Sequence, residues 1–128
     1  MTREEGIKRL VKYGETIREQ VFIDAKLAVH RRRLAVAETD CSKQVEQHRV
    51  ARLEKITEEN LRFTEDVEAC LNSMPPREKE VLWQFYVDRG FDYIGSLCEK
   101  LGVERTQVYR IKDRAVLTFC CLYTKDFY

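Results

Sequence analysis

Basic and polar side chains gather in one short stretch near the C-terminus, LGVERTQVYRIKDRAVL, residues 101–117. Arginine can bind guanine through two hydrogen bonds, glutamine can bind adenine in the same way, and threonine can offer its methyl group to thymine. Glu104 stands at the start of the stretch, where its carboxylate suits a helix dipole and could accept a hydrogen bond from cytosine. Lys112 and Arg114 lie further along and suit phosphates. This chemistry is that of a helix reading a DNA major groove.

Helical periodicity predicts which side of this stretch is exposed. With Val108, Ile111 and Ala115 turned inward, the polar residues of the first turns point outward. The alternative is an ordinary helical hairpin whose exposed face is only solvated. The candidate DNA-binding residues of the stretch are Glu104, Arg105, Thr106, Gln107, Tyr109, Arg110, Lys112 and Arg114.

The residues just before this helix have the spacing of a helix-turn-helix. Leu97 and Leu101 are four residues apart and share one helix face. Cys98 is small and lets a second helix approach, and Gly102 can adopt a left-handed backbone in the turn. Apolar contacts on both sides of such a turn hold two helices at a steep angle. We therefore expect the polar helix to be the second helix of this motif.

Prolines and glycines divide the C-terminal part into elements. Adjacent prolines at 75 and 76 suit a boundary followed by the first turn of a helix. We expect that helix to run from about Pro76 to Arg89 and to stop at Gly90. Its buried stripe is Val81, Leu82, Phe85 and Tyr86. The elements expected to follow are Asp92 as a cap, a helix over 93–101, the turn at Gly102 and a helix over about 105–123.

Apolar residues of the N-terminal part also recur at helical spacing. Gly6 and Gly14 weaken the first helix locally. Residues 38–42, ETDCS, are rich in turn and cap formers, so we expect a reversal there, and a single uninterrupted helix is the alternative. The first helix, to about residue 37, would bury Ile7, Leu10, Ile17, Val21, Leu27 and Leu34.

The second long helix, over about residues 43–71, contains a heptad seam typical of coiled coils. Asn60 occupies one seam position, where a buried amide fixes register or oligomeric state; the alternative is an Asn60 at a solvated helix edge. The seam could pack within the chain or against a second copy. Its residues are Leu53, Ile56, Asn60, Phe63, Val67, Cys70 and Met74.

Composition supports an all-α protein. The 128 residues include only 5 glycines and 2 prolines, and 44% of the residues are hydrophobic and 35% charged. Net charge is +1, but residues 104–114 hold four basic against two acidic residues, or +2. Residues 51–74 hold three basic against six acidic residues, or −3. A local basic patch on a nearly neutral protein can still contact phosphates.

Several classes of protein are excluded by what the sequence lacks. The five cysteines are odd in number and have no metal-ligand spacing, so we expect free thiols in a reducing cytosol, with no metal and no cofactor. No phosphate loop, nucleophile elbow or carboxylate pair indicates an enzyme. The apolar runs are too short to span a bilayer. The apolar C-terminal residues are expected to close on the N-terminal hairpin or on a partner; these are Phe119, Leu122, Tyr123, Phe127 and Tyr128.

Two motifs together resemble region 4 of bacterial sigma factors. They are MPPREKEVLWQFYV at residues 74–87 and SLCEKLGVERTQVYRIKDRAVL at residues 96–117, and the resemblance covers about residues 71–119. It implies a three-helix, sigma region 4-like helix-turn-helix domain over residues 73–128. It also implies that the residues around the turn contact a promoter element and that Arg77 meets the DNA backbone.

The long N-terminal helices make the chain look like the phage-encoded, sigma-like regulators of the RinA and ArpU type. The resemblance implies a sequence-specific transcriptional regulator of a phage or mobile element, acting on promoter DNA with RNA polymerase. Residues 1–72 would form a long helical hairpin, a candidate coiled coil, for binding a partner or a second copy. The expected location is the cytoplasm of a bacterial host, at the nucleoid. The alternatives are a DNA-packaging subunit of the small-terminase kind and a protein-interaction module that binds polymerase or another regulator.

Overall fold

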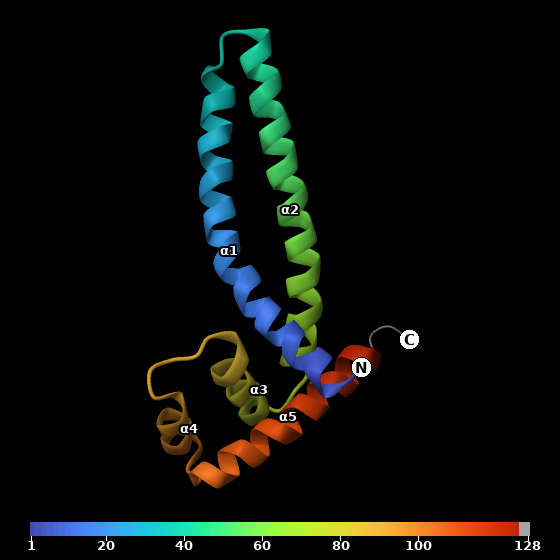
Figure 1. Cartoon of the computed structure of the whole chain (residues 1–128), viewed down its shortest axis with the longest axis vertical. Helices are drawn as coiled ribbons and strands as arrows, with labels where there is room; N and C mark the ends of the chain where they lie inside the picture. The colour runs from blue at the N-terminus through green and yellow to red at the C-terminus, as the bar shows by residue number, and fades with distance from the viewer. Residues whose placement is uncertain (126–128) are drawn as a thin grey trace. The chain divides into compact units, whose positions relative to one another are not determined.

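The structure is a computed structural model that describes residues 1–125, so Phe127 and Tyr128 lie outside the described residues. The described chain is all-helical and has no strand, which confirms the expected fold class at this level. Two long N-terminal helices precede three shorter ones (Figure 1). The elements are α1 (Arg3–Val36), α2 (Asp40–Asn72), α3 (Pro76–Leu82), the π-helical turn η1 (Trp83–Val87), α4 (Tyr93–Leu101) and α5 (Arg105–Lys125).

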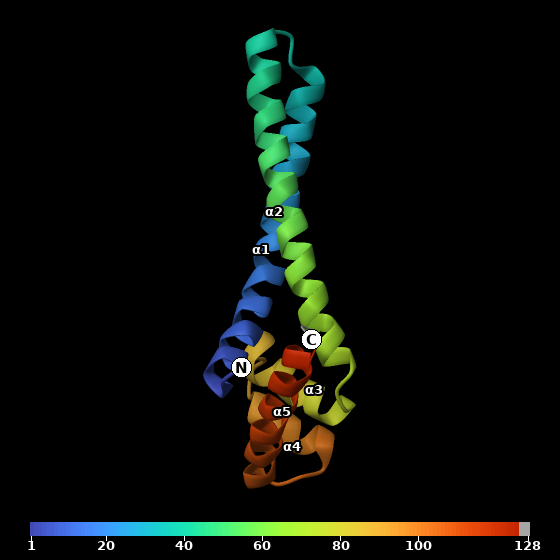
Figure 2. The same cartoon turned by 90° about the vertical axis from the view of Figure 1, so that its right-hand side faces the viewer.

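The reversal expected near residues 38–42 is confirmed. The first helix ends at Val36, and the second begins at Asp40. Thr39 caps the second helix, because its Oγ1 accepts a hydrogen bond from the backbone N–H of Ser42 at 3.1 Å. The two helices then run side by side in opposite directions (Figure 2).

The chain divides into two compact units. The first consists of Met1–Glu15 together with Glu65–Tyr128, and the second is Thr16–Thr64. The first turns of α1 and the last turns of α2 therefore belong to the same unit as the C-terminal helices. The expected functional division between residues 1–72 and 73–128 stays a prediction.

Polar side chains fix the pairing of α1 with α2 in the second unit. Asn60 Nδ2 donates to Gln20 Oε1 at 2.8 Å, and Gln20 Nε2 donates to Thr57 Oγ1 at 3.0 Å. Asn60 is half-buried and faces α1, so it lies in the seam between the two helices rather than at a solvated helix edge. Amides that satisfy one another between two helices favour one register over its neighbours.

A second polar contact lies nearer the helical reversal. His30 Nδ1 is 2.7 Å from Glu46 Oε2, and Arg49 donates to the other carboxylate oxygen at 3.2 Å. The hydrogen bond with His30 is the main cause that lowers the pKa of Glu46.

Val21, which we expected in the inward stripe of α1, is instead 66% exposed. It lies about 120° round the helix from the buried Leu27.

Two glycines of α1 allow close packing in the first unit. A Cβ atom on Gly6 would run into Cys120 Sγ of α5, and one on Gly14 would run into the backbone carbonyl oxygen of Val87 in η1. From the sequence we expected both glycines only to weaken the helix locally. Their absent side chains instead let α1 approach two surfaces more closely than any other residue type would.

The first turns of α1 cover the apolar residues of α5. Phe119 is fully buried and Tyr123 is 3% exposed. The guanidinium of Arg9 lies 4.6 Å from the centre of the Tyr123 ring, a cation–π contact. Arg3 Nη2 donates to Asp113 Oδ1 at 2.6 Å. Phe119 and Tyr123 therefore close on the N-terminal residues of the same chain, as expected.

The helix that we expected over residues 76–89 changes character halfway. It is α-helical to Leu82 and then forms a π turn, in which the N–H of Asp88 donates to the carbonyl of Trp83 at 2.9 Å. Trp83 meets the ring of Tyr13 edge-on at 6.1 Å. The Tyr13 hydroxyl donates to Glu68 at 2.8 Å. Burial is the main cause that raises the pKa of Tyr13, and the hydrogen bond to Glu68 is the second.

We predict that Gly14→Ala destabilises the protein even though alanine favours helix by about 1 kcal/mol. The added methyl group meets backbone rather than a mobile side chain, and such overpacking costs about 1–3 kcal/mol. Urea unfolding followed through Trp83, the only tryptophan, measures the change.

A second site gives the matched control. Gly6→Ala meets the sulfur of Cys120, so Cys120→Ala in the same chain should restore part of the lost stability. If Gly14→Ala raised stability, as at an exposed helical site, the close contact would be disproved.

Candidate nucleic-acid interface

A tight turn joins α4 to α5 and sets where α5 begins. Gly102 has φ 65° and ψ 36°, the left-handed conformation that the sequence predicted. The N–H groups of Gly102 and Val103 both donate to the carbonyl of Cys98, the latter at 3.2 Å. The bond from Val103 is the 6→1 bond found in a Schellman motif, and the bond from Gly102 is the 5→1 bond of an αL helix end; Val103 and Cys98 pack on the same apolar cluster.

Gln107 caps the helix that it belongs to. Its Oε1 accepts a hydrogen bond from the backbone N–H of Glu104 at 3.2 Å, and the carbonyl of Glu104 accepts the N–H of Val108 at 3.1 Å. This is one half of a capping box. The Gln107 carbonyl oxygen is therefore engaged at the helix start, whereas its amide nitrogen has no such role in this cap.

Asp92 does not cap α4 as we expected. It has φ 47° and ψ 49°, makes no side-chain hydrogen bond to the helix start, and turns its carboxylate against Gly95. A capping aspartate normally has an extended backbone. The left-handed backbone of Asp92 therefore replaces the cap with a sharp turn into α4.

The inward and outward faces of α5 are confirmed. Val108 and Ala115 are fully buried, and Ile111 is partly buried. Tyr109 is 39% exposed, but one edge of its ring contacts Phe85 at 5.8 Å between ring centres. The remaining outward residues are exposed; these are Glu104, Arg105, Thr106, Gln107, Arg110 and Arg114.

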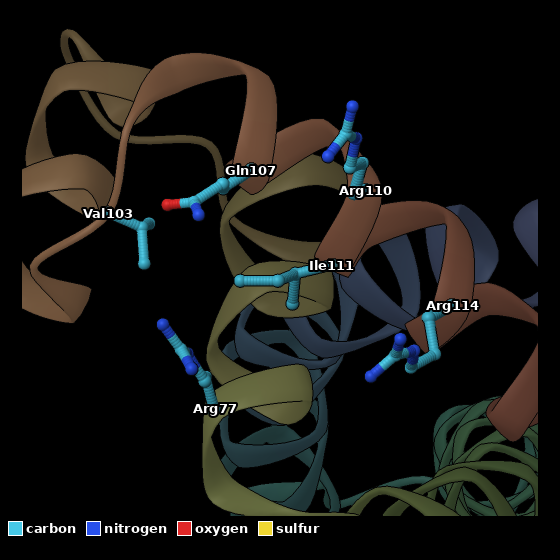
Figure 3. A pocket seen from close by; sticks show the side chains of 6 residues that line it. All are labelled: Arg77, Val103, Gln107, Arg110, Ile111 and Arg114. Carbon is cyan, nitrogen blue, oxygen red and sulfur yellow. The ribbon is translucent and has the colours of Figure 1, made fainter.

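A shallow hollow of about 220 Å³ lies between α3 and the start of α5. Figure 3 shows Arg77 reaching up from α3, whereas Gln107, Arg110 and Arg114 come from α5. Within residues 1–123, whose side chains the structure describes, none of the three arginines forms a salt bridge, and no acidic side chain lines the hollow. Its lining is Arg77, Val103, Gln107, Arg110, Ile111 and Arg114.

Lys112 lies outside this hollow. Its side chain is only 16% exposed, and its Nζ is 5.7 Å from the centres of the Phe85 and Tyr109 rings. Nζ also lies 2.9 Å from Asp113 Oδ1, which Arg3 contacts from α1. The hydrogen bond with Lys112, aided by the charge of Arg3, lowers the pKa of Asp113.

The structure thus divides the nine residues that the sequence singled out. Four of them, Arg77, Gln107, Arg110 and Arg114, line the hollow. The other five do not line it: Glu104, Arg105, Thr106 and Tyr109 are exposed near the start of α5, and Lys112 is held against aromatic rings. Sequence reasoning missed Arg3, which nothing in the local pattern connects to Asp113 across 110 positions.

Comparison of the chain with protein-family models, with curated proteins and with solved structures finds no match in any of the three. None of the helices within residues 1–125 combines the length and the apolar content that a membrane span requires. In the same range, no three histidine, cysteine or acidic side chains converge as metal ligands would.

We predict that Gly102→Ala destabilises the protein by about 1 kcal/mol, because a left-handed backbone costs a residue with a Cβ atom about 1–2 kcal/mol. Gly102→Asn should cost less, since asparagine tolerates this conformation. No atom lies within 4 Å of the added Cβ, so the cost is one of backbone conformation.

Gly90→Ala is the matched control for that measurement. Gly90 is exposed and only the tip of Gln84 lies near an added methyl group, at 3.4 Å. Equal stability of Gly102→Ala and the parent protein in urea unfolding would show that the turn does not depend on glycine.

Proposed function

We propose that the chain is a sequence-specific DNA-binding transcriptional regulator. In this proposal α4, the turn at Gly102 and α5 act as a helix-turn-helix similar to sigma factor region 4. The start of α5 enters the major groove, and Arg77 on α3 binds the backbone. The resemblance of residues 71–119 to region 4 makes promoter DNA the proposed target, and the long N-terminal helices joined to that part make a phage or mobile element the proposed source.

The observation that carries this proposal is the set of three arginines around the hollow. Arg77, Arg110 and Arg114 come from two helices and border one space with no carboxylate among its lining residues. Placing like charges together without counter-ions costs free energy unless an anion neutralises them. Phosphate groups of a duplex supply that charge at regular spacing.

The exposed residues at the start of α5 suit base reading. Arg105, Thr106 and Arg110 are exposed in the first two turns, where a recognition helix meets base edges. Gln107 retains amide hydrogens for a base acceptor although its oxygen serves the cap. Lys112 contributes to this face by supporting the Tyr109 and Phe85 rings rather than by binding a phosphate directly.

The N-terminal helices have the second role in the proposal. They would bind RNA polymerase or a second copy of the chain, and a dimer would raise affinity for paired half-sites through effective concentration. A protein-interaction module remains the rival function, because α5 could present the same arginines to an acidic protein surface.

Removing arginines separates phosphate contacts from base contacts. Arg77→Ala and Arg114→Ala should weaken binding to all duplexes alike and lower the slope of log affinity against log salt by about 1 each. Arg105→Ala and Arg110→Ala should cost about 1–3 kcal/mol of discrimination between the best site and random DNA. Fluorescence anisotropy with duplexes selected from a random library measures both quantities.

Arg62→Ala is the matched control, since it removes an exposed arginine that is paired with Glu58 in the second unit. It should change neither the slope nor the discrimination. If no duplex bound even at low salt while the protein was folded, the DNA-binding proposal would be wrong. Unchanged DNA affinity but lost binding to a protein partner in Arg105→Ala and Arg110→Ala would support the rival.

A further inference from the structure

The second unit has a small apolar core for its length. Within Thr16–Thr64, which the structure describes completely, the buried apolar side chains are those of Leu27, 6% exposed, and Val50, 9% exposed. Two helices that bury so little are marginally stable in isolation, because helix formation needs tertiary burial to offset its entropy cost. A further apolar surface on this unit therefore has a stabilising use.

Such a surface runs along the side of α1 that faces away from α2. Phe22, Ala25, Val29 and Val36 follow one another at spacings of three, four and seven residues. They lie about 140–200° round the helix from Leu27, which faces α2. Phe22 is 68% exposed, Val29 46% and Val36 75%.

These residues have the positions of a second coiled-coil seam. Phe22, Val29 and Val36 occupy the a positions of successive heptads, and Ala25 occupies a d position. The two other d positions hold Arg18 and Arg32. We call the stripe of these six residues the outer seam of α1.

We propose that the outer seam binds a second copy of the chain, with the two α1 helices antiparallel. In that arrangement each a residue forms a layer with a d residue of the second copy. Ala25 meets Val29 of the second copy, and Phe22 meets Arg32 of the second copy. The small alanine leaves room for valine, and the arginine stem covers the phenyl ring while its guanidinium can contact the ring face.

Flanking charges favour a second copy as the occupant and set its direction. Glu19 and Arg33 occupy e positions beside the outer seam. Neither forms a salt bridge among the described residues, although the charge of Arg33 helps to lower the pKa of Glu46 on α2. In an antiparallel pair e positions face one another, so Glu19 meets Arg33 of the second copy at both ends of the interface. A parallel pair would instead place Arg33 opposite Ala28 and Glu19 opposite Gly14, the g residues five positions earlier, so neither would meet an opposite charge.

One contact opposes the pairing. The same register brings Lys26 of the two copies together at the centre, and like charges repel. The dimer therefore combines two attractive charge contacts with one repulsive contact, over an apolar centre. Lys26→Gln should consequently tighten the dimer rather than weaken it.

This inference specifies the self-association that the proposed function includes, and it is tested without DNA. Sedimentation velocity of the full chain over a range of concentrations gives the dissociation constant of the dimer. Val29→Glu should raise that constant about tenfold or more, since a carboxylate would be buried against Ala25 of the second copy without a partner. Phe22→Arg should also raise it, because the new guanidinium would face Arg32 of the second copy. Leu61→Glu, a change at a residue of α2 that is 54% exposed, should leave it unchanged.

Charge reversal tests the antiparallel direction. Glu19→Arg and Arg33→Glu should each raise the dissociation constant about two- to fivefold, the range for exposed ion pairs, and the double variant should restore it. Circular dichroism of each variant checks that the helices persist.

Several outcomes would overturn the inference. A parent chain that stays monomeric up to its solubility limit would do so, and so would a ring of many copies. A folded Val29→Glu variant that dimerises like the parent protein would exclude the outer seam, and absence of rescue in the double charge variant would exclude the antiparallel direction. A parent chain that dimerises but binds no duplex would instead count against the proposed function alone.

Discussion

The close approach of the first turns of α1 to the C-terminal helices is the constraint on which the first unit depends. At Gly6 and Gly14 the helix surface lies against a sulfur atom and a backbone carbonyl with no room for a methyl group. This contact covers Phe119, whose full burial gives α5 a packed inner side along its second half. A helix that is packed on one side in this way can hold its other side in a fixed orientation.

The same contact governs the charges near the hollow. Asp113 precedes Arg114 in the sequence, yet its carboxylate is taken by Lys112 and by Arg3 of α1. A paired carboxylate competes less for a neighbouring guanidinium than a free one would. The first turn of α1 thus helps to leave the three arginines around the hollow without an acidic partner.

Periodicity in the sequence predicted the helices, and turn-forming residues predicted the reversal before Asp40 and the turn at Gly102, because each depends on residues close together along the chain. Contacts between distant residues could not be read in this way. Gly14 meets Val87 and Arg3 meets Asp113, and no local pattern joins these pairs. The stripe predicted for α1 also failed at one place, since α1 carries apolar residues on two sides and a periodicity argument alone cannot say which side faces α2.

For the candidate interface, the sequence predicted the outward side chains but not their grouping. Arg77 and Arg114 are 37 positions apart, and only the packing of α3 against α5 brings them to one hollow. Lys112 was expected to bind a phosphate, yet its ammonium group already contacts the rings of Phe85 and Tyr109 and the carboxylate of Asp113. Side chains on one face of a helix are therefore not equally free to bind a ligand, because some of them already contact side chains of neighbouring elements.

The proposed function depends most directly on contact between duplex DNA and the arginines around the hollow. Nuclear magnetic resonance of the full chain can follow the Nε–Hε signals of arginine side chains while a short duplex is added. The account predicts that the signals of Arg77, Arg110 and Arg114 shift together and saturate with one affinity, while that of Arg62 stays in place. The DNA-binding proposal would be contradicted if all three signals stayed unchanged at a DNA concentration at which signals elsewhere in the protein had saturated.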